Sequence, residues 1–321
     1  MKVFFPEVEE PETLRLLAGL AELKVGEEGR SYSEEDLARE MADVDIVVIT
    51  SQHRITRRII DKAPKLRAIV KYGSKPGSDN VDMTAANERR IQVAFTEGAN
   101  SDSVAEFTVA LTLALAKKLP TAITQVKRHA WRDASCLGVE LAKKTVGIVG
   151  LGVIGSKVAR KLSGLEMVVI ASDPYVSTEK ADLLHAKLVD LDVLLRESDV
   201  VSLHAKLTNE TTHMIGKNEL ALMKHTAYLI DTARGALIDE KALYQTLRDH
   251  RIAGAALDAF EIEPPLPSNP LLTLENVILT PHIASWTSDA LRKEAIMAID
   301  EVRRIMTGSK PMNLANPEVL K

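Results

Sequence analysis

Short apolar runs rich in β-branched residues alternate with longer amphipathic stretches along the whole chain of 321 residues. The runs are continuous rather than alternating in polarity, which is typical of strands covered on both faces. Strands separated by helical stretches predict right-handed βαβ units. The runs lie at residues 3–5, 45–49, 68–70, 91–95, 145–149, 167–170, 199–203, 228–230, 255–257 and 277–279. We therefore expect an α/β protein with doubly wound parallel sheets.

A glycine-rich turn follows the run at residues 145–149 and opens a helical stretch. It reads Gly150-Leu151-Gly152-Val153-Ile154-Gly155. In such a turn the first glycine permits a tight bend, the second lets a pyrophosphate approach the backbone, and the third lets helix and strand pack closely. The helix N-terminus supplies N–H donors to the phosphates. Taken alone, the pattern could equally be a tight packing turn.

An acidic residue supports the nucleotide interpretation. Asp173 follows the next apolar run and lies 23 residues after Gly150. This is close to the roughly 20 residues of the dinucleotide fingerprint, in which the carboxylate accepts hydrogen bonds from the ribose hydroxyls. No arginine in residues 172–175 could receive a 2′-phosphate, so the pattern favours NAD over NADP. The alternative for Asp173 is a turn residue before Pro174.

The position of this motif predicts how the domains are arranged. A chain of this length forms about two domains, and the motif begins in the middle of it. We expect two Rossmann-like domains, with the nucleotide-binding one inserted into the other and a ligand cleft between them. Helices are predicted over residues 103–118, ended by Pro120, and over residues 288–306, closed by Gly308. The predicted boundaries are 1–99 for a substrate-binding domain, 100–282 for an NAD-binding Rossmann domain and 283–321 for the return to the first domain.

Composition excludes several other classes of protein. The formal net charge is −4, which gives no electrostatic argument for nucleic acid or an acidic membrane surface. No stretch approaches the roughly 20 apolar residues of a membrane span. Cys136 is the only cysteine, so a reducing compartment is expected. Since the N-terminus also lacks a signal-peptide pattern, we expect a cytoplasmic, unprocessed chain without nucleic-acid or membrane partners. No cluster has metal-ligand spacing, so no metal is predicted.

Three polar side chains each come just after a later apolar run. They are Arg234, Glu263 and His282. Ligands of open α/β sheets bind beyond the carboxyl ends of the strands, so these side chains should share one edge. Each also has a simpler interpretation: a helix-end salt bridge for Arg234, a solvated turn for Glu263, and a surface or structural role for His282. Glu261 competes with Glu263 for the role of acidic partner.

In combination, these motifs resemble the D-isomer-specific 2-hydroxyacid dehydrogenases, the family of phosphoglycerate, glycerate and D-lactate dehydrogenases. The resemblance covers nearly the whole chain. The matching segments are residues 77–82, 103–106, 150–155, 198–204, 232–235, 258–265 and 281–283.

The resemblance implies an NAD-dependent oxidoreductase that interconverts a D-2-hydroxy acid and its 2-keto acid. The family's catalytic residues fall on Arg234, Glu263 and His282. Protonated His282 would deliver a proton to the carbonyl oxygen as general acid and take it back in oxidation. Glu263 would orient the imidazole and favour its charged form. Arg234 would hold the substrate carboxylate.

The resemblance also implies two sets of binding residues. The cofactor set comprises Gly150, Gly152, Val153, Ile154, Gly155, Asp173, His204, Thr232, Ala233, Arg234, Asp258, His282, Ile283, Ala284 and Ser285. Asp258 would meet the nicotinamide amide, whereas His204 is a weaker candidate for which backbone contact or packing is an alternative. The substrate set comprises Gly73, Ser74, Lys75, Gly77 and Arg234.

The chain departs from the family in the loop that cradles the substrate carboxylate. Lys75 stands where the first glycine of a G-x-G-x-D-N loop is expected, and Pro76 has no N–H to donate. We hypothesise that Lys75, Ser74 or the Gly77 amide replaces the missing donor. Lys71 and Lys75 make this edge basic, which would suit a substrate with a second anionic group, although solvated lysines are an equal alternative. A smaller departure is Asp231, which replaces a frequent asparagine.

Two rival functions and one assembly state remain open from the sequence. An NAD-sensing co-regulator on the same scaffold would have no need for the intact set of Arg234, Glu263 and His282. A formate dehydrogenase-like enzyme would lack the acidic partner at Glu263. By family analogy alone, the subunits are expected to pair as a homodimer through residues 117–144, which contain Trp131.

Overall fold

The protein is described by a computed structural model, in which residues 1–8, 10–27, 29–76 and 80–320 are described. The chain divides into two compact units. Unit 1 comprises Met1–Asn100 and Trp286–Lys321, and unit 2 comprises Ser101–Ser285. The sequence of unit 2 is therefore inserted between the two segments of unit 1.

Unit 1 contains a five-stranded parallel sheet with the strand order β2-β1-β3-β4-β5. Its strands are β1 (Lys2–Phe5), β2 (Glu22–Val25), β3 (Ile46–Ile49), β4 (Ala68–Lys71) and β5 (Gln92–Phe95). Its helices are α1 (Glu34–Glu40), α2 (Arg57–Lys62), α3 (Met83–Glu88) and α11 (Ser288–Met306), with the 3-10 turns η1 (Pro11–Leu17) and η5 (Pro317–Leu320).

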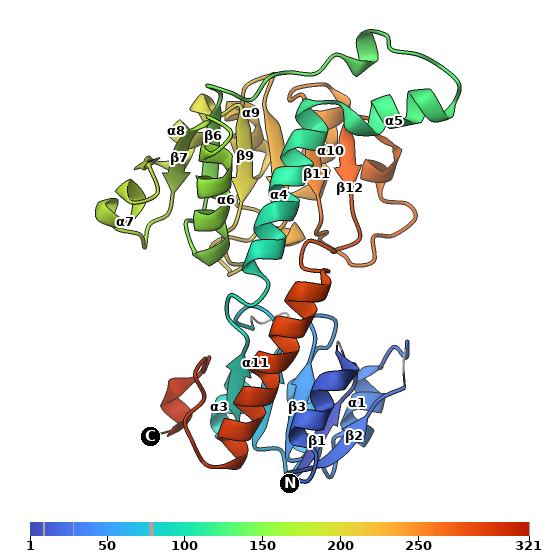
Figure 1. Ribbon diagram of the computed structural model, residues 1–321, viewed down its shortest axis with the longest axis vertical. Coiled ribbons are helices and arrows are strands. Elements are labelled where there is room, and N and C mark those ends of the chain that lie inside the picture. The colour runs from blue at the N-terminus through green and yellow to red at the C-terminus, as the bar shows by residue number, and fades with distance from the viewer. Residues whose placement is uncertain (9, 28, 77–79, 321) are drawn as a thin grey trace. The chain divides into compact units, whose positions relative to one another are not determined.

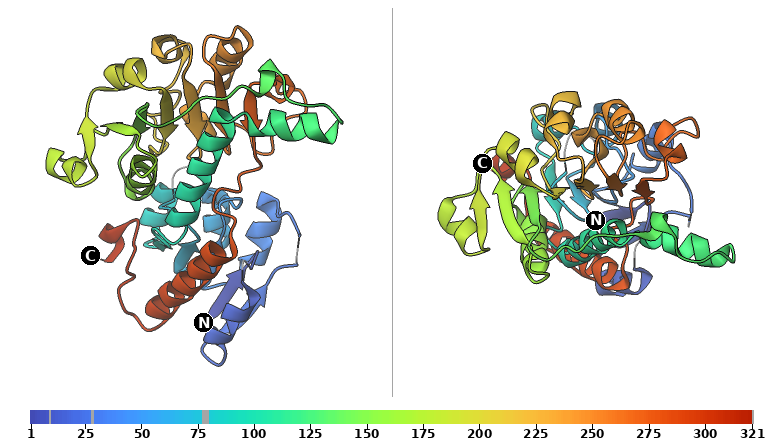
Figure 2. Two further views of the ribbon diagram at one scale, coloured as in Figure 1. Left: turned by 45° about the horizontal axis from the view of Figure 1, so that its top comes forward. Right: turned by 90° about the horizontal axis from the view of Figure 1, so that it is seen from above.

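Both faces of this sheet are covered, because successive residues of a strand point to opposite sides. On β3, Val47 and Ile49 pack against α1, α2 and α3, whereas Ile46 and Val48 pack against α11. Figures 1 and 2 show α11 running along one face of the sheet. The C-terminal segment thus completes the core of the N-terminal strands.

Unit 2 contains a seven-stranded parallel sheet with the order β12-β11-β10-β9-β6-β7-β8. The strands are β6 (Thr145–Val149), β7 (Val168–Ser172), β8 (Ala186–Leu188), β9 (Val200–Leu203), β10 (Tyr228–Asp231), β11 (Gly254–Leu257) and β12 (Val277–Leu279). The strand order reverses at β6, which pairs with both β7 and β9. Doubly wound sheets bind ligands at the carboxyl ends of the strands beside such a reversal. The two parallel sheets confirm the predicted fold class.

Helices cover both faces of the second sheet as well. One core cluster includes residues of α4 (Ser101–Ala116), α6 (Val153–Ser163) and α7 (Thr178–Asp182). The other includes residues of α8 (Leu191–Glu197), α9 (Lys217–Leu222) and α10 (Glu240–Arg248). The remaining elements are α5 (Leu119–Lys127) and the 3-10 turns η2 (Ala134–Cys136), η3 (Gly235–Leu237) and η4 (Pro270–Thr273).

The first long helix ends earlier than predicted. The sequence predicts a helix over residues 103–118 that stops before Pro120, but α4 ends at Ala116 and the chain turns at Lys118, whose φ is +53°. Pro120 instead lies in the first turn of α5, where its missing N–H has no intrahelical partner to lose. No single described helix is long and apolar enough to cross a membrane, and α4 with α5 meets the length and composition test only as a pair bent by 64°.

Two edge strands were not predicted from the sequence. Both β2 and β8 lie at an edge of their sheets, and neither is a continuous apolar run. Glu22 and Val25 at the ends of β2 are exposed, and Lys187 in the middle of β8 is exposed as well. Charged residues on edge strands prevent pairing with other chains. The same charges remove the apolar signal by which strands are found in a sequence.

Candidate active site

The glycine turn after β6 meets three separate geometric demands. Gly150 has a φ of +91°, and a Cβ there would lie 2.8 Å from the backbone nitrogen of Ala205. A Cβ on Gly155 would lie 2.0 Å from the carbonyl oxygen of Gly150, so only glycine lets α6 approach the turn this closely. Gly152, the N-cap of α6, faces open space, since a Cβ there meets nothing within 4 Å. The turn therefore leaves room beside the helix N-terminus.

Asp173 lies directly after β7 and joins this turn. Its Oδ2 accepts a hydrogen bond from the Leu151 N–H at 2.8 Å, and its Oδ1 accepts one from the Tyr175 N–H at 2.9 Å. The second bond is the turn contact that the simpler interpretation expects. The first places the carboxylate against the glycine turn, where a dinucleotide ribose binds. Open backbone at Gly152, a helix N-terminus and this carboxylate fit a dinucleotide.

His282 and Glu263 form a close pair. His282 Nδ1 lies 2.7 Å from Oε2 and 2.9 Å from Oε1 of Glu263. Glu263 Oε1 also accepts a hydrogen bond from the Phe260 N–H at 3.0 Å. Burial raises the pKa of Glu263, but the hydrogen bond and charge of His282, the Phe260 amide and the Arg234 charge outweigh it, so the pKa falls below its usual value. Glu263 is therefore an anionic partner for the imidazole.

Glu261, the rival acid, takes a different partner. Its Oε1 lies 3.1 Å from His213 Nε2 and accepts a hydrogen bond from the Glu240 N–H at 2.9 Å. The two acids of this loop therefore contact different histidines. Of the two, Glu263 contacts the histidine at the carboxyl end of β12.

Arg234 reaches the same region because its turn packs on the Glu263 loop. A Cβ on Gly235 would lie 1.9 Å from the carbonyl carbon of Phe260, so the two backbones touch. The Arg234 Nη1 donates a hydrogen bond to the Ala233 carbonyl oxygen at 2.7 Å. Its charge also lowers the pKa of Glu263. The fold thus brings Arg234, Glu263 and His282, which are far apart in the sequence, to one edge of the sheet.

Asp258 is engaged with the loop that carries His282. Its buried carboxylate accepts hydrogen bonds from Thr280 Oγ1 at 2.6 Å and from the Ile283 and Ala284 amides at 2.9 and 2.7 Å. Sequence reasoning assigned this residue to the nicotinamide amide and missed its hold on residues 280–284. The sequence signal was a single acid at the end of an apolar run, which does not reveal its partners.

Two further predicted residues are buried or partly buried at neighbouring strand ends. His204 follows β9, and its Nε2 lies 2.8 Å from Ser202 Oγ. Burial lowers the pKa of His204 to about 3, so the imidazole is neutral. The hydroxyl of Thr232 lies 2.8 Å from that of Thr108 on α4. These contacts hold the side chains that follow β9 and β10 in place, next to the turn that carries Arg234.

The predicted substrate loop belongs to unit 1. Gly73 has a φ of +81°, and its N–H donates to Thr96 Oγ1 at 2.6 Å. Lys71 is only 1% exposed, and its Nζ donates to the carbonyl oxygens of Tyr72 at 2.9 Å and Ser74 at 3.3 Å. The exposed side chains of the loop are those of Ser74 and Lys75, whereas Gly77 lies outside the described residues.

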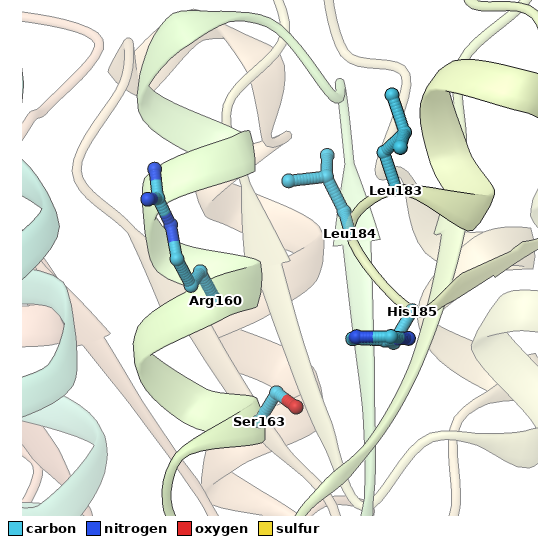
Figure 3. Close-up of a pocket in the computed structure, with 5 residues that line it drawn as sticks. All are labelled: Arg160, Ser163, Leu183, Leu184 and His185. Atoms are coloured by element: carbon cyan, nitrogen blue, oxygen red, sulfur yellow. The ribbon is translucent and has the colours of Figure 1, made fainter.

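A separate hollow of about 340 Å³ lies between α6 and the segment that follows α7 (Figure 3). Its lining residues are Arg160, Ser163, Leu183, Leu184 and His185. None of the predicted site residues lines it. Across the described residues, no group of three or more His, Cys, Asp and Glu side chains is placed to hold a metal ion.

Comparison with known proteins identifies the family. Residues 109–284 match the model of the D-isomer specific 2-hydroxyacid dehydrogenase NAD binding domain. The chain is 40% identical over 90% of its length to a glyoxylate reductase from Thermofilum pendens, of which it covers 86%. The chain therefore belongs to the D-isomer specific 2-hydroxyacid dehydrogenase family. The matched model is that of an NAD binding domain, which supports the predicted cofactor, NAD.

Other relatives differ in length and in the activity that their names give. The chain is 40% identical over 88% of its length to a D-3-phosphoglycerate dehydrogenase from Archaeoglobus fulgidus, but it spans only 54% of that protein. It spans 59% of a second such enzyme, from Methanocaldococcus jannaschii. A D-lactate dehydrogenase from Aquifex aeolicus, solved with NAD and lactic acid, superposes with a TM-score of 0.87 at 29% identity, covering 98% of each chain.

Proposed function

We propose that this protein interconverts a D-2-hydroxy acid and its 2-keto acid with NAD as the hydride carrier. The observation that carries the proposal is the contact between His282 and Glu263 in the unit that bears the dinucleotide turn. A carboxylate that is hydrogen-bonded to one ring nitrogen orients the imidazole and favours its charged form, as a histidine general acid requires. A protein that only senses NAD has no need of it.

The proposed roles follow from the contacts. When bound, the cofactor would supply the hydride as NADH in reduction and accept it as NAD+ in oxidation. Glu263 fixes Nδ1 of His282, which leaves Nε2 to deliver a proton to the carbonyl oxygen in reduction and to take it back in oxidation. Arg234 holds the substrate carboxylate through paired N–H donors. These three roles account for the proton and the substrate's charge.

The cofactor-binding residues are proposed on the same basis. The backbone at Gly152 and the first turn of α6 would receive the pyrophosphate. Asp173 would accept hydrogen bonds from the ribose hydroxyls and disfavour a 2′-phosphate. Because the Asp258 carboxylate already accepts hydrogen bonds from the loop of residues 280–284, we assign it to positioning that loop.

The substrate is proposed to be a small 2-keto acid, consistent with the relatives named glyoxylate reductase and hydroxypyruvate reductase. Exposed Lys75 would interact with a second anionic group where the substrate carries one. A panel of 2-keto acids, with phosphorylated and sulfonated members, tests this by the loss of NADH absorbance. No turnover with any member, in a protein that binds NADH, would contradict the proposed activity and favour an NAD-binding regulator.

A homodimer is the proposed assembly, formed through residues 117–144. Figure 1 shows α5 and the segment after it extending away from the rest of unit 2. The segment exposes apolar side chains, among them Ile123, Val126, Trp131 and Leu137. It returns to the body where the Val139 N–H donates to the Ala116 carbonyl oxygen. Contiguous exposed apolar surface on a protein marks an interface, and a second copy of the chain is the expected partner.

Sedimentation equilibrium tests the dimer. Ile123→Asp should yield monomers, because it puts a charge in the apolar surface of α5. Leu183→Asp is the matched control, since Leu183 is 84% exposed outside this segment. Equal masses for both variants and the wild type would contradict the proposed interface. A cytoplasmic location is proposed from the single cysteine, Cys136, and cell fractionation tests it.

A further inference from the structure

Asp231 is a buried carboxyl group that the proposed mechanism does not use. It ends β10, and its side chain is fully buried. Oδ1 accepts a hydrogen bond from the Ala233 N–H at 2.8 Å. Oδ2 is buried and has no hydrogen-bond partner. Within residues 101–285, all of which are described, it is the single buried side-chain nitrogen or oxygen in this state.

Asp231 and Arg234 hold the same residue from its two sides. The Ala233 N–H donates to Asp231, while the Ala233 carbonyl oxygen accepts from Arg234 Nη1 at 2.7 Å. A change of charge on Asp231 therefore acts directly on the turn that presents the Arg234 guanidinium. An ionised oxygen with no donor is costly at such depth, whereas a neutral carboxyl group is less so.

Burial and the surrounding charges act in opposite directions on the Asp231 carboxyl group. Burial raises the pKa of Asp231 to about 7, although the amides of Ala233 and Arg234 and the charges of Arg234 and His282 oppose this shift. The raised value reflects burial among apolar neighbours. Its two neighbours in the sheet are Leu203 on β9 and Leu257 on β11.

The other titratable groups at this edge have their own partners. His204, after β9, is neutral and contacts Ser202. Asp258, after β11, accepts hydrogen bonds from residues 280–284. Glu263 is paired with His282. On α4, the group that reaches this strand end is the uncharged hydroxyl of Thr108.

We propose that Asp231 is a positioning residue: the charge of its buried carboxyl group, which holds the Ala233 amide beside the Arg234 turn, keeps the Arg234 guanidinium in place and supports the reaction in more alkaline solution. This inference rests on the proposed function for its effect on the reaction. The negative charge attracts the protonated imidazole and the guanidinium. Asp231 thereby extends the pH range over which keto-acid reduction runs.

Asp231→Asn tests the effect on the reaction. The amide keeps an acceptor for the Ala233 N–H but cannot ionise. In acidic solution, where the wild-type carboxyl is neutral, kcat/KM for reduction should match the wild type. Above neutrality the variant should fall behind, with the alkaline limb displaced by about one pH unit and the rate there reduced about tenfold. Superimposable pH profiles would overturn the coupling to the reaction.

Thermal unfolding tests the titration itself without any assay of activity. The carboxyl of Asp231 has a higher pKa in the folded than in the unfolded chain, so the stability it contributes is full below about pH 4 and is lost as the pH rises through about 7. The Tm of the wild type relative to Asp231→Asn should therefore decline between about pH 5 and pH 8. A constant difference would overturn the proposal, whatever reaction the protein catalyses.

Asp199→Asn is the matched control. Asp199 also borders β9, but its carboxylate accepts hydrogen bonds from the Thr145 N–H at 2.9 Å and Lys224 Nζ at 3.1 Å. Although burial raises the pKa of Asp199, these partners lower it overall, so its Tm difference from the wild type should be flat over the same range. If Asp231→Asn fails to fold, infrared spectra of the wild type should still show a buried protonated carboxyl that disappears between about pH 5 and pH 8. Its absence would overturn the proposal.

Discussion

The two loops that carry the predicted binding residues are held in place by different chemistry. In unit 2, the buried carboxylate of Asp258 fixes the loop of residues 280–284 and thereby His282. In unit 1, the loop after β4 is fixed mainly through its backbone. Buried Lys71 donates to two of its carbonyl oxygens, and Thr96 accepts the Gly73 N–H.

Because the two loops are held differently, substitutions in the two units should have different effects on the reaction. Unit 2 fixes the functional side chains themselves, because Glu263 contacts His282 on another loop and Arg234 donates to the Ala233 carbonyl oxygen in its own turn. Unit 1 fixes the path of the backbone and leaves the side chains of Ser74 and Lys75 exposed. Substitutions in unit 2 should therefore slow the reaction with every substrate. Substitutions in the loop of unit 1 should alter the choice among substrates.

The largest effect is expected from His282→Ala. Removing the proposed general acid should lower kcat by roughly 10²–10⁴ with every 2-keto acid. NADH binding, followed by fluorescence, should remain, because the glycine turn and Asp173 are unchanged. A variant that turns over like the wild type would reject the assignment of His282.

A smaller loss is expected from Glu263→Gln, and Glu261→Gln is its matched control. A hydrogen bond to a charged group contributes about 1.5–3 kcal/mol, so kcat should fall about 10- to 150-fold for Glu263→Gln. Glu261→Gln should stay within about twofold of the wild type, since Glu261 contacts His213 instead of His282. Steady-state kinetics of the pair would contradict the assignment if Glu261→Gln were the slower enzyme.

The sequence predicted the sheets because their central strands are continuous apolar runs. It missed the edge strands β2 and β8 because charged residues interrupt their apolar pattern, whereas the edge strands β5 and β12 are apolar runs and were predicted. It also misplaced the end of α4, because a proline stops one helix and starts another equally well. The predictable part of the fold is therefore the part that burial alone determines.

The candidate site shows the same limit at the level of single residues. Strand ends and spacing selected Arg234, Glu263 and His282, but they could not choose between Glu263 and Glu261. That choice depends on which carboxylate reaches which histidine, a contact between distant segments. The environment of Asp231 could not be predicted from the sequence either, because a buried oxygen without a hydrogen-bond donor is seen only in the packed fold.

Asp173→Ala should alter the cofactor preference, with an effect on binding smaller than those on turnover. The loss of one charged hydrogen-bond acceptor for the ribose should weaken NADH binding by about tenfold. NADPH binding should change less, because the repulsion of its 2′-phosphate is relieved at the same time. Isothermal titration with both cofactors measures this. An unchanged ratio of the two affinities would show that Asp173 serves only its turn, through the Tyr175 amide.

The smallest effect, and the one that tests unit 1, is expected from Lys75→Ala. Lys75 is exposed, and an exposed ion pair contributes about 0.2–1 kcal/mol. The variant should therefore lose up to about fivefold in kcat/KM on 2-keto acids with a second anionic group. Monoanionic 2-keto acids should be affected less, since they lack the partner charge. Equal losses on both classes would mean that Lys75 contributes only general positive charge, and the contrast between a unit that sets rate and a unit that sets selectivity would lose its support.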